Sequence, residues 1–252
     1  HPFGEWYERE ANIMTSKSDL RPLQSVPEAL DLVQRMIEHI PQKRPLATQV
    51  CHHPFFWSAQ KRLEFLVDFS DRLEHELPDS PLVLAVESNA CHVVGRSWDR
   101  KLHRELLEDI GKYRKYDSAS VRDCLRLIRN KRHHFNELPS PIKTIMSPLP
   151  SGFMLYFEMK YPKLLMHCVS VCARFLDRDK EFASFCRVIA PLFKNYAFNP
   201  IDKEKEKDRD NIGLYHTMTN KNDNVRERGG SEKERGSERG SEKGSEKERG
   251  SE

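Results

Sequence analysis

The stretch RNKRHHF, residues 129–135, concentrates side chains that can bind phosphate and move protons. Arg129 and Asn130 can hold an anion in a fixed hydrogen-bonding geometry, and an imidazole such as that of His134 changes its charge near neutral pH. Cleavage of an RNA strand without metal needs one group to take the 2′-hydroxyl proton, another to protonate the departing 5′-oxygen, and donors that hold the charge on phosphorus. With Tyr116 added, this set could supply all three.

The same residues also have structural interpretations. A histidine at the end of a helix commonly bonds to a backbone carbonyl, and spacing alone favours this explanation for His134. A phenol such as that of Tyr116 is a poor base at neutral pH unless nearby cations favour its ionised form, and Lys115, Arg129 and Lys131 are the candidates. The residue types by themselves therefore leave the chemistry open.

A helix predicted to begin at Ser120, with Asp123 completing a capping box, must position RNKRHHF. Two sets of residues define opposite sides of this helix: Val121, Cys124, Leu125 and Ile128 on the apolar side, and Arg122, Arg126, Arg129 and His133 on the other. Between Lys112 and Phe135 there are eight Lys or Arg and two Asp, whereas the whole chain carries a net charge of only +3. Tyr113, Tyr116 and Phe135 interrupt the basic run. The pattern fits phosphate contacts with base stacking, or a solvated helix face.

The rest of the chain also reads as mainly α-helical. Helical spacing of apolar residues predicts helices from Ser25, as N-cap, to near Pro41, from about Ser58 to Leu77, from about Trp98 to Tyr113, and from Pro162 onward. The first of these would bury Leu30, Val33, Met36, Ile37 and Ile40. Only short segments such as HVVG (92–95) and FMLYF (153–157) could be strands. A mainly α fold is therefore expected.

The six cysteines fit a packed core better than a metal site or disulfide framework. They are Cys51, Cys91, Cys124, Cys168, Cys172 and Cys186. No pair has the C-x₂-C spacing of structural zinc sites, and Cys168 and Cys172 fall on an apolar helical face. We expect no signal peptide before them. We expect reduced thiols, no metal and no cofactor.

The composition of the chain predicts where the protein is located and which part of it is disordered. No run approaches the ~20 apolar residues that a membrane helix needs, so we expect no membrane segment and a cytoplasmic setting. Residues 201–252 hold thirteen Lys or Arg and fourteen Asp or Glu, and end in a Gly-Ser-Glu-Lys/Arg repeat. Such a composition cannot bury enough apolar surface to offset the entropy of ordering. Residues 199–252 are therefore predicted to be a disordered, charged tail.

Two groups of segments resemble a known family. HPFGEWYEREANI and LVQRMIEHIPQKRPLATQVCHHPFFWS resemble the end of a protein-kinase C-lobe. KRLEFLVDFSDRLEHE, YDSASVRDCLRLIRNKRHHFNELP and YFEMKYPKLLMHC resemble the kinase-extension nuclease (KEN) domain of the inositol-requiring kinase/endoribonuclease of the unfolded-protein response and, more distantly, of RNase L. The resemblance implies kinase C-lobe remnant helices over 1–57, an all-helical ribonuclease domain over 58–198 and the tail over 199–252.

The resemblance also implies roles for single residues. The catalytic Tyr of the family falls on Tyr116, its Arg-Asn pair on Arg129 and Asn130, and its general acid on His134. Lys131 would contact the RNA backbone, and His133 is expected to be supportive. Arg122 and Arg126, on the basic side of the helix, are further candidates for RNA binding.

The implied function is that of a metal-independent endoribonuclease that cuts RNA stem-loops and leaves a 2′,3′-cyclic phosphate, in mRNA splicing or decay of the unfolded-protein response. Its partners would be RNA and a second copy or a full-length relative in a dimer, at the cytosolic face of the endoplasmic reticulum if the chain is part of a longer protein. The alternative is a truncated, non-catalytic KEN module that binds RNA or modulates a full-length relative through dimerisation.

Kinase activity is not expected, because the Gly-rich loop and the H-R-D, D-F-G and A-P-E segments do not occur in the sequence. Arg44 matches the arginine that pairs with the A-P-E glutamate in kinases. If Arg44 were buried without that partner, it would cost several kcal/mol. Residues 1–57 are therefore predicted to be a destabilised remnant.

Overall fold

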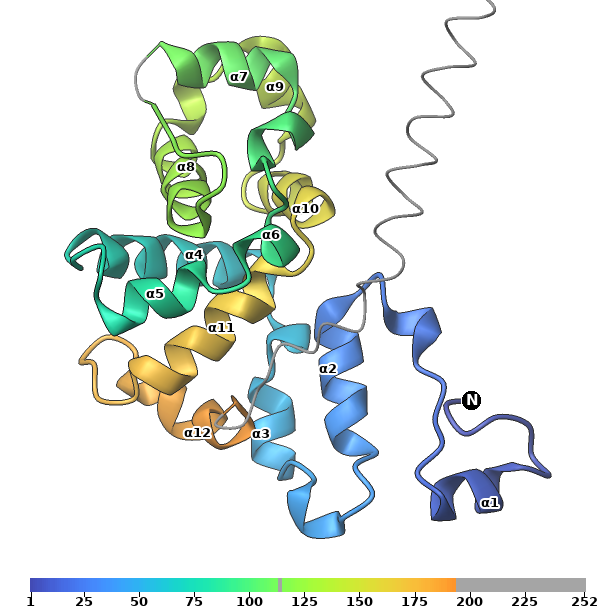
Figure 1. The fold of residues 1–252 in the computed structure, drawn as a ribbon. Coiled ribbons are helices and arrows are strands. Elements are labelled where there is room, and N and C mark those ends of the chain that lie inside the picture. Colours follow the sequence, from blue (N-terminus) through green and yellow to red (C-terminus); the bar gives the residue numbers. More distant parts are fainter. Residues whose placement is uncertain (113–114, 194–252) are drawn as a thin grey trace, which may run out of the picture. The chain divides into compact units, whose positions relative to one another are not determined.

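The computed structural model describes residues 1–112 and 115–193, which lie within one compact unit. Figure 1 shows these residues as helices joined by short loops. No strand occurs among the described residues, so the expectation of a mainly α fold is confirmed. The α-helices are α1 Arg9–Met14, α2 Pro27–Met36, α3 Ala47–His52, α4 Ala59–Glu74, α5 Pro81–Glu87, α6 Ala90–Val93, α7 Arg104–Gly111, α8 Val121–His133, α9 Ser140–Ile145, α10 Ser151–Lys160, α11 Leu164–Phe175 and α12 Ala183–Phe193. The 3₁₀ helices are η1 Arg21–Leu23, η2 Pro41–Lys43, η3 Pro54–Phe56, η4 Trp98–Lys101 and η5 Phe135–Glu137.

Helices α4 and α8 pack against each other (Figure 1). Helix α4 begins directly after Ser58, close to the predicted start, and Ser58 caps it by accepting a hydrogen bond from the Lys61 amide. The apolar stripe of α4 is buried from Leu63 to Leu73, but Leu77 lies beyond the helix and is 71% exposed. The amphipathic pattern therefore placed α4 correctly and extended it by one turn too many.

Helix α11 lies at the centre of the apolar core. Every residue from Leu164 to Ala173 is buried, and the helix contacts α4, α5, α12 and η3. An aromatic cluster continues the core, in which Phe65 contacts the rings of Trp57, Phe69, Phe182 and Phe185. Because aromatic side chains each bury a large apolar area, this cluster stabilises the packing of α4 against the segment around α12.

Several predicted elements differ in the structure. Ser25 does not cap α2, whose N-cap is Val26. The stretch from Trp98 to Gly111 is split into η4 and α7, although Leu102, Leu106 and Ile110 are buried as predicted. Tyr113 lies outside the described residues.

The two possible strands are helical. HVVG contributes to α6 and ends at Gly95, whose φ of +96° is in the left-handed region that glycine tolerates. FMLYF forms the middle of α10. Short apolar runs do not distinguish a strand from a buried helix.

The segment before α4 has two parts. No residue of 1–26 is buried, whereas α3 packs on α12, and η3 packs on α2 and α11. The side of α2 that faces the protein carries Glu28, Ala29 and Leu32, while Met36 and Ile40 are exposed, so the predicted apolar side is wrong at these positions.

Arg44 differs from its prediction as well. Its side chain is exposed and donates to the backbone carbonyls of Glu38, at 2.7 Å, and His39, at 3.5 Å. It is therefore not a buried, unpaired cation, and that reason for instability over 1–57 does not hold.

Among the described helices, none combines the length and apolar composition needed to cross a bilayer. The predicted charged tail, 199–252, lies outside the described residues.

Candidate active site at the end of helix 8

The start of α8 is fixed by hydrogen bonds from its own loop and from α5. Ser120 accepts from the amide of Asp123 at 3.1 Å. The carboxylate of Glu87 accepts from the Ser120 hydroxyl and from the amides of Val121 and Arg122, at 2.7–3.0 Å. These contacts satisfy amides that have no partner within a helix and place a negative charge at its positive end. The predicted reciprocal capping box is absent, because Asp123 instead accepts from the amide of Asp117.

The last turn of α8 brings polar side chains to one cavity of about 350 Å³. Its lining residues come from α7, the loop before α8, α8 itself and η5: Asp109, Ile110, Tyr116, Asn130, Lys131, His134 and Glu137. Three of the four predicted catalytic residues, together with Lys131, therefore line the same hollow. Arg129 is not among the lining residues.

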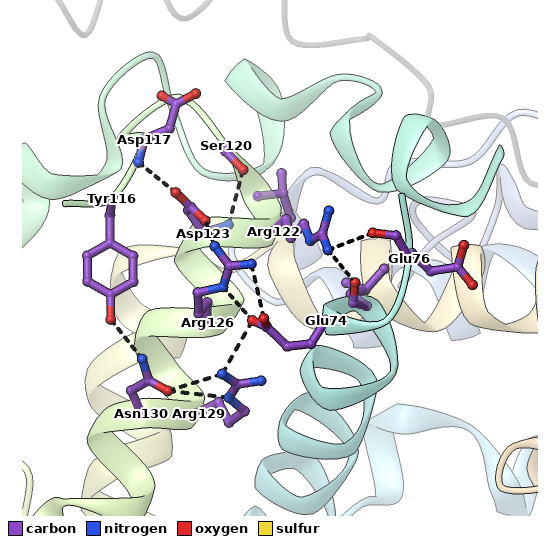
Figure 2. A network of polar contacts seen from close by, with 12 residues as sticks. Glu74, Glu76, Tyr116, Asp117, Ser120, Arg122, Asp123, Arg126, Arg129 and Asn130 are labelled. Carbon is purple, nitrogen blue, oxygen red and sulfur yellow. Dashed lines mark hydrogen bonds and ion pairs between the residues drawn. The ribbon is translucent and has the colours of Figure 1, made fainter. Parts of the chain in front are cut away.

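Tyr116 and Asn130 are directly bonded. The amide Nδ2 of Asn130 donates to the Tyr116 hydroxyl oxygen at 2.9 Å (Figure 2). The Tyr116 ring packs edge-on against Trp98, with centroids 6.1 Å apart, and the Trp98 indole donates to the carbonyls of Asp117 and Ser120 at 3.1 Å. The loop before α8 is thereby held so that the Tyr116 hydroxyl oxygen meets Asn130.

His134 lies where α8 ends. Its backbone amide donates to the carbonyl of Asn130 at 3.0 Å, and its ring Nδ1 lies 2.9 Å from the Glu137 carboxylate. Because a carboxylate only accepts, Nδ1 carries a hydrogen and Nε2 is the nitrogen available to the cavity. The side chain is 61% exposed. The helix-end explanation of His134 as a partner of a backbone carbonyl is not the arrangement found. His133 is exposed next to it.

Lys131 is buried, and its ammonium donates to the carboxylate of Asp109 at 2.7 Å. Asp109 comes from α7 and is itself buried. This ion pair forms part of the cavity wall. Contact between Lys131 and an RNA backbone remains a prediction.

The arginine row of α8 faces the end of α4 rather than open solvent (Figure 2). Arg122 donates to the carbonyl of Leu73, in the last turn of α4, at 2.5 Å, and to the carbonyl of Glu76, just after α4, at 3.0 Å. Arg126 pairs with Glu74 and with Asp123, the latter at 2.7 Å. Neither residue lines the cavity, and RNA binding by either one remains a prediction.

The charges in this row alter the titration of Glu74. Burial alone would raise the pKa of this carboxyl, but the hydrogen bond from Arg126 and the positive charges of Arg126, Arg129 and Arg122 lower its pKa overall. The hydrogen bond to Glu74 raises the pKa of Arg126 in turn. Glu74 is therefore ionised over the whole neutral range, and it neutralises part of the basic row.

Arg129 lies between the two helices. Its Nη1 is 2.9 Å from Asp71 Oδ1, its Nη2 is 3.3 Å from Glu74 Oε1, and both Nε and Nη2 donate to Asn130 Oδ1 at 3.3 Å. Its side chain is 12% exposed. The predicted Arg-Asn pair is thus in contact, but only Asn130 reaches the cavity.

The sequence analysis did not single out several residues around the site. Glu137 could have been found from its spacing of three residues after His134. Asp71, Glu74, Glu87 and Asp109 gave no signal, because each meets its partner only after distant segments pack together.

None of the six cysteines lines this cavity. Cys124, Cys168, Cys172 and Cys186 are buried, as the apolar pattern predicted, whereas Cys51 and Cys91 are exposed. Burial raises the pKa of the thiols of Cys124 and Cys168. Within the described part of the chain, no group of three or more His, Cys, Asp or Glu side chains is arranged to hold a metal ion.

Comparison with known proteins shows which family the chain belongs to. Residues 62–186 match the family described as Ribonuclease 2-5A. The chain is 42% identical over 191 residues to the "Sensor for unfolded proteins in the ER ire1" of Schizosaccharomyces pombe, with 73% of this chain and 18% of the relative covered. It is 41% identical over 185 residues to the "Serine/threonine-protein kinase/endoribonuclease IRE1" of Oryza sativa subsp. japonica, with 73% and 21% covered.

A human protein, "Serine/threonine-protein kinase/endoribonuclease IRE2", is 44% identical over 171 residues, with 66% of this chain and 18% of the relative covered. The chain therefore spans about a fifth of the length of these curated relatives. Family match, relatives and helical architecture agree that the chain belongs to the IRE1-type kinase/endoribonuclease family and carries its KEN ribonuclease domain.

Proposed function

We propose that this chain is a metal-independent endoribonuclease, acting on RNA stem-loops in mRNA processing or decay of the unfolded-protein response. The observation that carries the proposal is the single cavity lined by Tyr116, Asn130, Lys131 and His134. It brings a possible base, a neutral hydrogen-bond donor, a cation and a possible acid to one place. The named activity of the relatives, kinase/endoribonuclease, supports the same reaction class.

In the proposed reaction, the 2′-hydroxyl oxygen attacks the adjacent phosphorus while its proton moves to the phenolic oxygen of Tyr116. As a base Tyr116 reacts as the phenolate, and the Asn130 amide donates a hydrogen bond to its oxygen. His134, protonated on both nitrogens and held at Nδ1 by Glu137, gives the Nε2 proton to the departing 5′-oxygen. The bond from phosphorus to the 5′-oxygen breaks, leaving a 2′,3′-cyclic phosphate and a 5′-hydroxyl. The ammonium of Lys131 adds positive charge to the cavity wall, where charge builds on the phosphoryl oxygens.

The test compares cleavage of a stem-loop RNA in EDTA by wild type, His134→Ala and His133→Ala. Loss of a general acid lowers rates by about 10²–10⁴-fold, so we expect that loss for His134→Ala alone. The neighbouring His133→Ala is the matched control, because His133 is an exposed histidine on the same turn and does not line the cavity. Products from wild type should end in a 2′,3′-cyclic phosphate.

Equal activity of wild type and His134→Ala would contradict the assignment. A wild type that binds the RNA without cutting it at any protein concentration would favour the non-catalytic module. Sedimentation at the concentrations of the assay would determine whether cleavage follows dimer formation, as we propose, with a second copy or a full-length relative. If the chain is part of such a relative, its proposed place is the cytosolic face of the endoplasmic reticulum. We assign no phosphotransfer to residues 1–57.

A further inference from the structure

Arg129 occupies a position that does not fit a phosphate ligand. Its side chain is 12% exposed and lies between α4 and α8, on the side of Asn130 opposite Tyr116 (Figure 2). Arg129 does not line the cavity. All three of its nitrogens face protein oxygens: Nε and Nη2 meet Asn130, Nη2 also meets Glu74, and Nη1 meets Asp71. These contacts occupy four of the five N–H groups of the guanidinium, so Arg129 has little capacity left to bind a phosphate.

The local charge balance is also unfavourable for a phosphate at Arg129. Asp71 lies 2.9 Å and Glu74 3.3 Å from its guanidinium. Glu74 is shared with Arg126, and its pKa is lowered, so it stays ionised at neutral pH. Asp71, next to the Nη1 of Arg129, and Glu74, shared with Arg126, offset the charge of the Arg129 guanidinium and would repel a phosphate placed there. The positive charge of Arg129 is therefore directed at α4.

The contact with Asn130 gives Arg129 a different task. A side-chain amide has an acceptor end, Oδ1, and a donor end, Nδ2. A rotation of 180° exchanges the two ends with almost no change in shape. Two N–H groups of Arg129 point at Oδ1 of Asn130, so the other end, Nδ2, must face Tyr116. In the reversed amide, Nδ2 would meet the guanidinium, donor against donor. Arg129 thus determines which end of Asn130 meets the phenolic oxygen.

We propose that Arg129 is a positioning residue, held by Asp71 and Glu74 of α4, which fixes the Asn130 amide so that its Nδ2 supports the oxygen of Tyr116. The relay runs from the two carboxylates through the guanidinium and the amide to the phenol. The proposal rests on the proposed function and changes one part of the prediction from sequence, in which Arg129 was a phosphate ligand. It also assigns roles to Asp71 and Glu74, which lie outside the cavity.

The kinetic test uses Arg129→Lys and Asp71→Asn with Asp68→Asn as the matched control. Asp68 is an exposed carboxylate on the same helix as Asp71, and its substitution removes the same charge. Loss of one charge-assisted hydrogen bond corresponds to about a tenfold to hundredfold change. We expect Asp71→Asn and Arg129→Lys to lower kcat by that factor with KM unchanged, and the double variant to be no worse than Arg129→Lys. Asp68→Asn should match wild type.

A phosphate ligand would behave in the opposite way. Arg129→Lys would then raise KM, Arg129→Ala would reduce the slope of log affinity against log salt by about one, and Asp71→Asn would tighten RNA binding by removing a negative charge. Any of these three results would overturn the proposal. Asp71 is 52% exposed, so Asp71→Asn is expected to fold.

A second measurement does not depend on cleavage. The side-chain amide signals of Asn130, followed by ¹⁵N NMR of the full chain, should shift and exchange faster with solvent in Arg129→Lys and in Asp71→Asn but not in Asp68→Asn. Unchanged Asn130 signals in Arg129→Lys would contradict the relay. If the signals change as expected while the wild type cuts no RNA, the relay stands and the proposed function fails.

Discussion

Asn130 is the residue at which the two sides of the candidate site meet. Its Nδ2 contacts Tyr116 in the cavity and its Oδ1 contacts Arg129 outside it. A single neutral amide therefore connects the phenol to an ionic network on another helix. Arg129 and Asn130 are neighbours in the sequence but face different surroundings, because consecutive side chains on a helix point about 100° apart.

Tyr116 offers the cleanest single-residue prediction. Tyr116→Phe removes only the hydroxyl and keeps the ring that packs on Trp98, so the fold should persist. Because a positioned base contributes about 10²–10⁴-fold, we expect kcat for stem-loop RNA to fall by that factor with little change in melting temperature. Tyr156→Phe is the control, since its hydroxyl contacts His103. A Tyr116→Phe variant that cuts RNA at the wild-type rate would remove Tyr116 from the mechanism.

At the scale of elements, α8 is held at its start by α5 and along its basic side by α4. The carboxylate of Glu87 accepts three hydrogen bonds at the first turn of α8. The arginines of α8 in turn bind the last carbonyls and carboxylates of α4. What the sequence presents as a row of repelling cations is therefore a helix-to-helix interface.

Glu87 should be sensitive to substitution although it is far from the chemistry in sequence. Glu87→Gln removes the negative charge of the group that accepts hydrogen bonds from the first backbone amides of α8. Loss of such a cap lowers the free energy of unfolding by about 0.5–2 kcal/mol. We expect a loss of that size in the free energy of unfolding by urea. The control is Glu105→Gln, an exposed glutamate in the first turn of α7, where surface substitutions change stability by less than about 0.5 kcal/mol. Equal stability of the two variants would contradict the capping role.

At the scale of the whole described unit, a buried polar cluster joins the segment before α4 to α12. Asp31 accepts from both Arg35 and His53, at 2.6–3.0 Å, and Arg35 also donates to the carbonyl of Leu192. The His53 ring is fully buried and stacks near Phe193. Residues 27–57 are thus packed on the helices that follow them, whereas no residue of 1–26 is buried. The instability predicted for residues 1–57 stays a prediction.

Asp31→Asn tests this connection. Removing one partner of a buried ion pair costs about 3–5 kcal/mol, so the variant should unfold at lower urea concentration at pH 7. The control is Asp19→Asn, which breaks an exposed Asp-Arg pair and should leave the urea midpoint unchanged. Equal midpoints for Asp31→Asn and wild type would show that residues 27–57 do not support the fold.

The pH dependence of Asp31 follows from its titration. Burial alone would raise the pKa of this carboxyl, but hydrogen bonds from His53 and Arg35 and their charges lower its pKa overall. Its contribution is therefore fully present above the unfolded value of about 4 and is lost as pH falls through the lower folded value. The difference in unfolding free energy between wild type and Asp31→Asn should accordingly shrink below about pH 4.

The sequence by itself determined the helical class, the apolar sides of α4 and α8, and four of the residues that line the cavity, Tyr116, Asn130, Lys131 and His134. These features depend on short-range periodicity and on motifs, which are properties of neighbouring residues. Tyr116, Asn130 and His134 could be grouped in advance because the chemistry and the resemblance both selected them.

The tertiary structure decided which partners the charged side chains meet. The contact of Arg129 with Asp71 joins residues 58 positions apart, and Lys131 meets Asp109 from a different helix. No local pattern encodes such pairs, because an ionic partner is chosen by which helices pack and in which register. The direction of a guanidinium depends on that packing, and so the sequence named Arg129 while only the fold showed which way it faces.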